Sequence, residues 1–313
     1  MSSFKVVVSD QVFPTVDTER SLLSEIDAEL VVAEGSVADV LEVAADADAI
    51  LNTYLPWSAE SISALERCRI IARYGIGVDN VDLEAARRAG IVVTNVPDYS
   101  VEEVGVHALG LLLAALRKIP WADRKVREGT WGIDEFRPIR RLSELTVGLL
   151  GFGRIGRQLA SGLEAMGGRV IVHDPYLDPS PELPELVDLP SLLSRSDIIS
   201  VHAPLTPQTR GIIDAEAIGQ MREGAILVNT SRGPLVQLDA VTTALREGRL
   251  AAAALDVFDQ EPLDPARIEG VPNLVATPHM AFYSEEALAE SQRKAATQVV
   301  KVLKGQEPDY QVN

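Results

Sequence analysis

The chain of 313 residues exceeds the roughly 100–200 residues of a typical domain, so its length predicts two domains. Hydrophobic residues make up 46% and charged residues 24%, a balance that argues against disorder. The formal charge of −17 would repel a nucleic-acid backbone or an anionic membrane, so we expect neither as a partner. An anionic substrate would need local positive charge, which draws attention to the arginines.

The single cysteine, Cys68, cannot form an internal disulfide and cannot build a structural zinc site, so we expect a buried thiol and no metal. The first residues, Met1 to Lys5, lack the pattern of a signal peptide. The longest apolar run, Leu109–Leu116, is shorter than the roughly 20 residues that a membrane helix needs. We therefore expect no membrane association and a cytoplasmic location.

Short β-branched runs alternate with helical segments along the chain. The runs are apolar throughout rather than alternating, which is typical of strands buried on both faces of a parallel sheet. Repeated β–α units of this kind predict an α/β fold. The prolines between Pro175 and Pro190 predict a surface loop instead. The predicted strands are Phe4–Val8, Ala49–Leu51, Ile70–Ala72, Ile91–Thr94, Val147–Leu150, Val170–His173, Ile198–His202, Ile226–Asn229, Ala252–Asp256 and Leu274–Thr277.

Two helix starts bracket the middle of the chain. The segment from Ser100 to Glu103 has the sequence of a capping box and predicts a helix over 101–118. This helix is almost entirely small and apolar, so we expect it in a core or in a subunit interface. Ser284 followed by two glutamates predicts the start of a second helix over 285–303.

A glycine-rich turn, Gly151-Phe-Gly153-Arg-Ile-Gly156, lies between a predicted strand and a helical segment. Its glycines permit a tight turn and close approach of a pyrophosphate, and the amides of Arg154 and Ile155 open a helix N-terminus that attracts anions. Asp174 ends the next strand, about 20 residues after the first glycine. Its carboxylate would accept hydrogen bonds from the adenosine ribose and repel a 2′-phosphate, which predicts NAD rather than NADP.

Three further predicted strands end in polar residues, at the sheet edge where α/β proteins bind ligands. Arg232 follows one strand, Glu261 follows the next, and His279 comes after Pro278 has ended the third. A histidine can protonate a developing alkoxide, a neighbouring glutamate favours the protonated ring, and a guanidinium can grip a carboxylate through two hydrogen bonds. Together they predict the reduction of a 2-keto acid by hydride transfer.

The other histidines have simpler interpretations. His107 lies in the apolar helix and is expected to be a packing residue. His173 and His202 lie at strand ends and are expected to line the cofactor groove without a chemical role.

In this order, and over nearly the whole chain, the motifs resemble those of the D-isomer-specific 2-hydroxyacid dehydrogenases. The resemblance implies two doubly wound parallel-sheet domains. A Rossmann cofactor domain, 101–284, would be inserted into a discontinuous flavodoxin-like substrate domain made of 1–100 and 285–313. It also implies catalytic roles for Arg232, Glu261 and His279, with closure of the two domains over the active site. The motifs that carry the resemblance are Gly151–Gly156, Asn229–Gly233, Leu255–Pro262 and Thr277–His279.

The resemblance implies further contacts with both ligands. Four residues beyond the glycine turn and Asp174 would contact the cofactor: Pro204, Thr209, Thr230 and Asp256. Five would contact the substrate, the first four in a loop that binds its carboxylate through backbone amides: Arg73, Gly75, Ile76, Gly77 and Phe282. Within the family, the chain looks most like the subgroup of the C-terminal-binding corepressors, which have Trp in place of Phe282. The family forms homodimers through its cofactor domains, which suits the apolar helix.

The leading hypothesis is an NAD-dependent enzyme acting on a small D-2-hydroxy acid or 2-keto acid of the glyoxylate or hydroxypyruvate type. The alternative from another class is an NAD(H)-sensing interaction protein similar to the corepressors. Phosphoglycerate or phosphite oxidation also stays open. Formate dehydrogenases of this superfamily pair their histidine with glutamine, so Glu261 argues against that activity.

Overall fold

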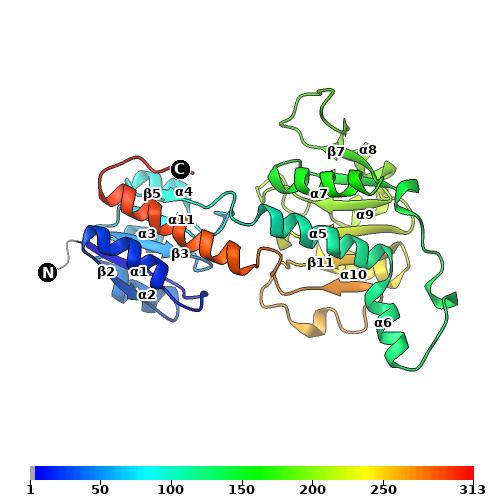
Figure 1. Ribbon diagram of the computed structural model, residues 1–313, viewed down its shortest axis with the longest axis horizontal. Coiled ribbons are helices and arrows are strands. Elements are labelled where there is room, and N and C mark those ends of the chain that lie inside the picture. The colour runs from blue at the N-terminus through cyan, green and yellow to red at the C-terminus, as the bar shows by residue number, and fades with distance from the viewer. Residues whose placement is uncertain (1–3) are drawn as a thin grey trace. The chain divides into compact units, whose positions relative to one another are not determined.

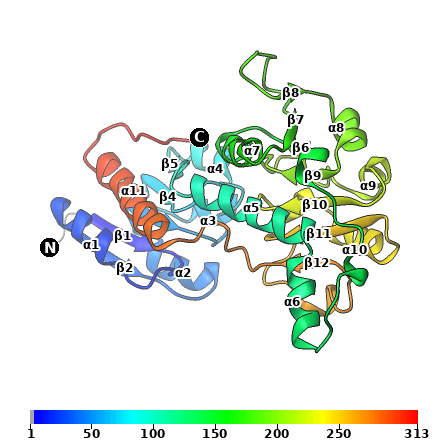
Figure 2. The same cartoon turned by 45° about the vertical axis from the view of Figure 1, so that its right-hand side comes forward.

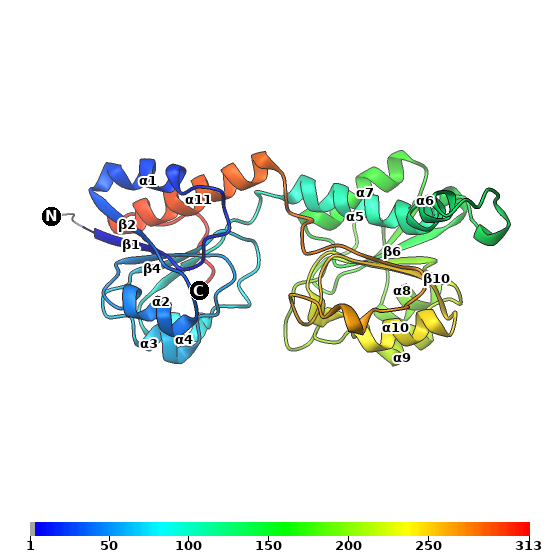
Figure 3. The ribbon, with the colours of Figure 1, turned by 90° about the horizontal axis from the view of Figure 1, so that it is seen from below.

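The computed structural model describes residues 4–313. Residues 1–3, which begin the predicted first domain and the segment without a signal-peptide pattern, lie outside the described residues. The chain divides into two compact units (Figure 1). The first contains the residues up to Tyr99 together with Ser284–Asn313, and the second is Ser100–Tyr283. In each unit a parallel sheet lies between two layers of helices (Figure 3).

The first unit has a five-stranded parallel sheet with the order β2-β1-β3-β4-β5, which is the flavodoxin-like order. Helices α1 and α11 cover one face, and α2, α3 and α4 cover the other (Figure 3). The strands are β1 (Phe4–Val8), β2 (Ala28–Val32), β3 (Ala49–Asn52), β4 (Ile70–Arg73) and β5 (Val92–Thr94). The helices are α1 (Asp17–Leu23), α2 (Val37–Ala44), α3 (Ala59–Ser63), α4 (Leu83–Arg88) and α11 (Glu285–Leu303).

The second unit has a seven-stranded parallel sheet with the order β12-β11-β10-β9-β6-β7-β8. The chain reverses direction across the sheet between β6 and β9, as in the Rossmann fold. The strands are β6 (Thr146–Leu150), β7 (Arg169–His173), β8 (Glu185–Leu186), β9 (Ile198–Val201), β10 (Ala225–Asn229), β11 (Leu250–Leu255) and β12 (Leu274–Ala276). The helices are α5 (Val101–Leu116), α6 (Ile119–Arg127), α7 (Arg154–Ala165), α8 (Leu189–Arg195), α9 (Ala215–Gln220) and α10 (Leu238–Arg246).

Helix α5 is a core helix of the second unit, because Ala108, Leu112 and Ala115 on one of its faces are completely or almost completely buried against the sheet. It ends before Lys118, whose left-handed backbone (φ 56°) turns the chain into α6 (Figure 2). Over residues 4–313, no single helix is long and apolar enough to cross a membrane. The bent pair α5 and α6 meets that test only when its two halves are taken together.

All ten predicted strands are present, with ends that differ by at most two residues, but the prediction lacks two strands. The strand β2 lies at the edge of its sheet and is only partly buried, so it carries Glu29 and lacks the continuous apolar run that marked the others. The strand β8 has two residues within the proline-rich loop and pairs with β7 at the other sheet's edge. Both misses are therefore edge strands, where burial on two faces is not required.

The predicted capping box at Ser100 is wrong, although the helix does begin there. The Ser100 hydroxyl is buried and makes no capping hydrogen bond, because its backbone (ψ 26°) departs from the extended conformation of a side-chain cap. The prediction at Ser284 is confirmed: ψ is 163°, and the hydroxyl accepts a 2.9 Å hydrogen bond from the Ala287 amide. The two junction helices thus start in different ways.

Candidate active site

The His279 ring and the Glu261 carboxylate lie together at the carboxyl edge of the seven-stranded sheet. His279 Nδ1 is 2.7 Å from Glu261 Oε2, and the two side chains are 27% and 35% exposed. The other carboxylate oxygen, Oε1, accepts a 2.8 Å hydrogen bond from the Phe258 amide. Partial burial raises the pKa of Glu261, but the hydrogen bonds from His279 and Phe258 outweigh it and hold that pKa below its usual value. The pair therefore combines an anion with a ring that can carry a proton.

Asp256 fixes the backbone that presents His279. Its side chain is fully buried and accepts hydrogen bonds from the Thr277 hydroxyl (2.5 Å), the Met280 amide (3.0 Å) and the Ala281 amide (2.9 Å). The His279 amide donates to the Asp256 carbonyl at 2.7 Å, and His279 itself adopts a left-handed backbone (φ 52°). A non-glycine residue in that conformation is strained and needs such support. Asp256 was predicted as a cofactor ligand. In the structure its side chain is bonded to the loop that carries His279.

His107 also reaches this loop, which the sequence did not suggest. Its Nε2 lies 3.2 Å from the Thr277 hydroxyl and 3.5 Å from Asp256 Oδ1. No local pattern signals this contact, because His107 lies on α5, far from Thr277 along the chain. His107 therefore makes a polar contact with this loop in addition to its predicted role in packing.

Arg232 lies in the loop after β10. The neighbouring strand, β11, leads to Glu261. Its guanidinium donates to the Ser231 carbonyl at 2.9 Å, and its positive charge also lowers the pKa of Glu261. The next residue, Gly233, is required by packing, because a Cβ there would collide with the backbone of Phe258. This contact brings the loops of Arg232 and Glu261 together. The structure therefore gathers all three predicted catalytic side chains in the second unit.

The glycine turn lies between β6 and α7 in the same unit. Gly151 has a left-handed backbone (φ 96°), and a Cβ there would lie 2.7 Å from the His202 backbone, so no other residue fits. Gly153 has open space where its Cβ would be, directly before Arg154 and Ile155 at the start of α7. Asp174 accepts hydrogen bonds from the Phe152 amide (2.9 Å) and the Tyr176 amide (3.0 Å), which ties the end of β7 to this turn.

Two buried polar atoms at this edge have no partner among the described residues: the Thr230 hydroxyl after β10 and His202 Nδ1 after β9. Such orphaned groups are expected where a ligand completes the hydrogen bonding. Desolvation lowers the pKa of His202 to about 4, so the ring is neutral at physiological pH. The predicted ligands Pro204 and Thr209 form a turn in the same loop after β9, where the Thr209 hydroxyl donates to the Pro204 carbonyl at 2.6 Å. The open space at Gly153 and these orphaned atoms fit a dinucleotide.

The residues predicted to bind the substrate are divided between the units. In the second unit, the Phe282 ring lies edge-on to the His279 ring, with 6.3 Å between the ring centroids. In the first unit, the buried Arg73 ends β4 and donates to the Thr53 carbonyl. Gly75, Ile76 and Gly77 form the loop that follows. The Ile76 carbonyl accepts a hydrogen bond from the Asn95 amide group at 2.7 Å, and the Gly75 carbonyl accepts one from the Val96 amide at 3.1 Å.

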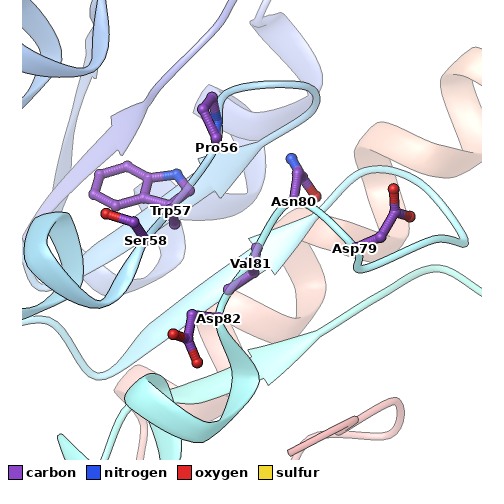
Figure 4. Close-up of a pocket in the computed structure, with 7 residues that line it drawn as sticks. All are labelled: Pro56, Trp57, Ser58, Asp79, Asn80, Val81 and Asp82. Carbon is purple, nitrogen blue, oxygen red and sulfur yellow. The ribbon is translucent and has the colours of Figure 1, made fainter. Parts of the chain in front are cut away.

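A depression of about 290 Å³ also lies in the first unit (Figure 4). It contains none of the predicted site residues, although it borders the end of the loop after β4. The residues that line it are Pro56, Trp57, Ser58, Asp79, Asn80, Val81 and Asp82.

Comparison with known protein families identifies the second unit. Residues 109–281 match the family described as D-isomer specific 2-hydroxyacid dehydrogenase, NAD binding domain. Among curated proteins, D-3-phosphoglycerate dehydrogenase of Methanocaldococcus jannaschii is 38% identical over 99% of this chain and 59% of its own length. The corresponding enzyme of Mycobacterium tuberculosis is 38% identical over 97% of this chain and 57% of its own length. The chain thus spans less than two thirds of these relatives.

Solved structures match almost the whole chain. The TT0316 protein from Thermus thermophilus is 35% identical, with a TM-score of 0.89 and coverage of 99% of this chain and 100% of that one. D-Lactate dehydrogenase from Aquifex aeolicus, complexed with NAD and lactic acid, is 28% identical, with a TM-score of 0.89 and coverage of 96% of both chains. These findings agree with the glycine turn and the site geometry. The chain belongs to the D-isomer specific 2-hydroxyacid dehydrogenase family.

Proposed function

We propose that this protein is an NAD(H)-dependent oxidoreductase that interconverts a small D-2-hydroxy acid and the corresponding 2-keto acid. The observation that carries the proposal is the 2.7 Å contact between His279 and Glu261, in the unit that holds the dinucleotide turn. An acid–base pair beside a nucleotide site is the arrangement that a carbonyl reduction requires.

The three charged side chains divide the chemistry. Arg232 holds the substrate carboxylate and polarises the adjacent carbonyl through its guanidinium. His279 donates its proton to the C2 oxygen during reduction and removes it during oxidation. Glu261 favours the protonated ring and fixes its orientation. NADH supplies the hydride when it is bound.

The nucleotide would lie against the turn from Gly151 to Gly156. The α7 amides of Arg154 and Ile155 would receive the pyrophosphate, and Asp174 would receive the ribose hydroxyls. The orphaned Thr230 hydroxyl offers a further hydrogen bond. A carboxylate at Asp174 favours NAD over NADP, because it repels a 2′-phosphate.

We assign substrate binding to Arg73, the backbone amides of Gly75–Gly77, and Phe282. Glyoxylate, hydroxypyruvate, pyruvate and phosphohydroxypyruvate are the compounds to compare. Relatives in the family are named for phosphoglycerate and lactate, and a structure 28% identical is a glyoxylate reductase.

The substitution His279→Gln tests the proposal. Turnover of the best 2-keto acid should fall by roughly 100- to 10,000-fold, because the proton donor is lost. The dissociation constant of NADH, measured by fluorescence titration, should stay within about twofold, because the ring serves the chemistry rather than the nucleotide. Near-normal turnover in the variant would reject the role of His279. Tight NADH binding without oxidation by any of the acids would favour an NAD(H)-sensing interaction protein.

We also propose that the protein is a homodimer formed through α5, α6 and the segment 128–141 that follows. Trp131 in this segment is 90% exposed, and Ile133, Ile119 and Val126 are more than half exposed. Exposed apolar side chains that recur within one short stretch of the chain favour a subunit interface there.

A further inference from the structure

A buried polar cluster in the first unit lies directly before the Gly75–Gly77 loop. Its centre is Tyr74, which is 1% exposed. The Tyr74 amide donates to the Asn52 carbonyl at 3.0 Å, and the Tyr74 carbonyl accepts a 2.5 Å hydrogen bond from the Ser291 hydroxyl. Its phenol donates to Glu19 Oε1 at 2.7 Å. Backbone and side chain of this one residue are therefore fixed together.

Glu19 is the unusual member of the cluster, because it is a carboxylate with no exposed surface. Gln292 donates to both of its oxygens, at 3.1 and 3.0 Å, and also to the Thr15 carbonyl at 2.8 Å. The donors to Glu19 thus come from the end of β4 and from α11, whereas Glu19 itself lies on α1. The cluster joins three elements at one point.

The far side of the loop is held by Asn95 and Val96, whose hydrogen bonds to Ile76 and Gly75 are described above. The near side is held by the two residues before the loop, through the contacts of Tyr74 and the hydrogen bond from Arg73 to the Thr53 carbonyl. The position of the loop amides therefore depends on where Tyr74 lies.

Packing alone does not explain this arrangement. A phenylalanine would fill the same space beside Phe13, whose ring centroid is 4.6 Å away, without a buried carboxylate. Burying a carboxylate is costly, and an apolar replacement is often at least as stable, so such groups serve a defined geometry in some proteins. Burial and the nearby Glu19 raise the pKa of Tyr74 well above its usual value, so the phenol remains a hydrogen-bond donor throughout the physiological range.

We propose that Tyr74, through its hydrogen bond to Glu19, is a positioning residue that fixes the Gly75–Gly77 amides for the substrate carboxylate. The inference rests on the proposed function of that loop. Tyr74 does not touch the substrate in this scheme. It sets how tightly the substrate binds, and the hydride step itself is left to the second unit.

The variants Tyr74→Phe and Glu19→Met test the inference with two measurements, because each removes one partner of the hydrogen bond between the phenol and the carboxylate. Hydrogen–deuterium exchange of a peptide covering residues 73–80 should become several-fold faster in both variants, because Tyr74 is then held by its backbone hydrogen bonds alone. The KM for the best 2-keto acid should rise by about tenfold, with kcat and the NADH dissociation constant within about twofold. In the double variant, loop exchange and KM should change little beyond their values in Tyr74→Phe, because both substitutions remove the same hydrogen bond.

Cys68→Ala is the matched control. It removes a buried side chain that donates to the Ile70 carbonyl, at the opposite end of the same strand β4. It should lower the melting temperature while loop exchange and KM stay unchanged. Unchanged loop exchange in Tyr74→Phe and Glu19→Met, or equal acceleration in the control, would overturn the positioning role. Faster exchange with a constant KM would overturn its link to the substrate.

These readouts separate the two proposals. If the unmodified protein reduces none of the 2-keto acids, the proposed function fails. The exchange measurement then still decides whether Tyr74 positions the loop.

Discussion

The hydrogen bond from His279 helps to keep the Glu261 carboxylate charged. Because the pKa of Glu261 is lowered in the folded protein, its carboxylate is charged at neutral pH. The carboxylate is lost when the pH falls through that lowered value. Glu261 therefore remains a charged acceptor for the His279 ring at neutral pH.

Glu261→Gln should flatten the acid side of the pH profile of 2-keto acid reduction, because no carboxylate remains to be protonated as the pH falls. It should also reduce kcat/KM by roughly 10- to 100-fold at neutral pH. Initial rates measured across the pH range in which the variant stays folded check both effects. Asp259→Asn is the control, since it removes a charge from the same loop where Asp259 pairs with Arg267 at 2.7 Å. An identical profile for Glu261→Gln and the unmodified protein would contradict the assignment.

At the scale of the elements, the two helices that begin at the unit junctions differ in how they are capped. The Ser284 hydroxyl satisfies an amide at the start of α11, whereas the buried Ser100 hydroxyl makes no such bond at the start of α5. The same residue type therefore contributes differently to the two helices.

Ser284→Ala should lower the free energy of unfolding by about 1 kcal/mol, the usual effect of losing a side-chain cap. Ser100→Ala should leave it unchanged or raise it slightly, because a buried hydroxyl without a partner is replaced by a methyl group. Urea unfolding of both variants provides the comparison. Equal losses of stability would show that Ser100 caps α5 in solution.

At the scale of the molecule, the proposed dimer depends on the exposed apolar residues after α5. Trp131→Ser combined with Ile133→Ser should convert the dimer to a monomer, because the central apolar contacts are removed. Light scattering coupled to gel filtration measures the mass. Tyr176→Ser is the control, since Tyr176 is equally exposed, at 89%, but lies in the loop after β7. A dimer that survives the double substitution would exclude this surface.

The sequence predicted the α/β fold and the separate strand ends that carry Arg232, Glu261 and His279. Those features are local: apolar runs, glycine spacing and polar residues after strands. The sequence did not predict contacts between residues that lie far apart along the chain. The link from His107 to Thr277 joins residues 170 positions apart, and that from Tyr74 to Glu19 joins residues 55 apart. Such pairs have no periodic signature, because only the packing of the sheet and helices brings them together.

The first unit is built from two segments on either side of the second unit, and this affects the order in which the units can fold during translation. Residues 4–99 leave the ribosome before the second unit, whereas α11, which packs against β3, β4 and α1, is synthesised after it. The second unit is continuous and can fold as soon as it has emerged. Until α11 arrives, the nascent first unit exposes Glu19 and the sheet face that α11 covers. Translation therefore leaves an aggregation-prone intermediate whose lifetime is set by the synthesis of everything between Ser100 and Tyr283.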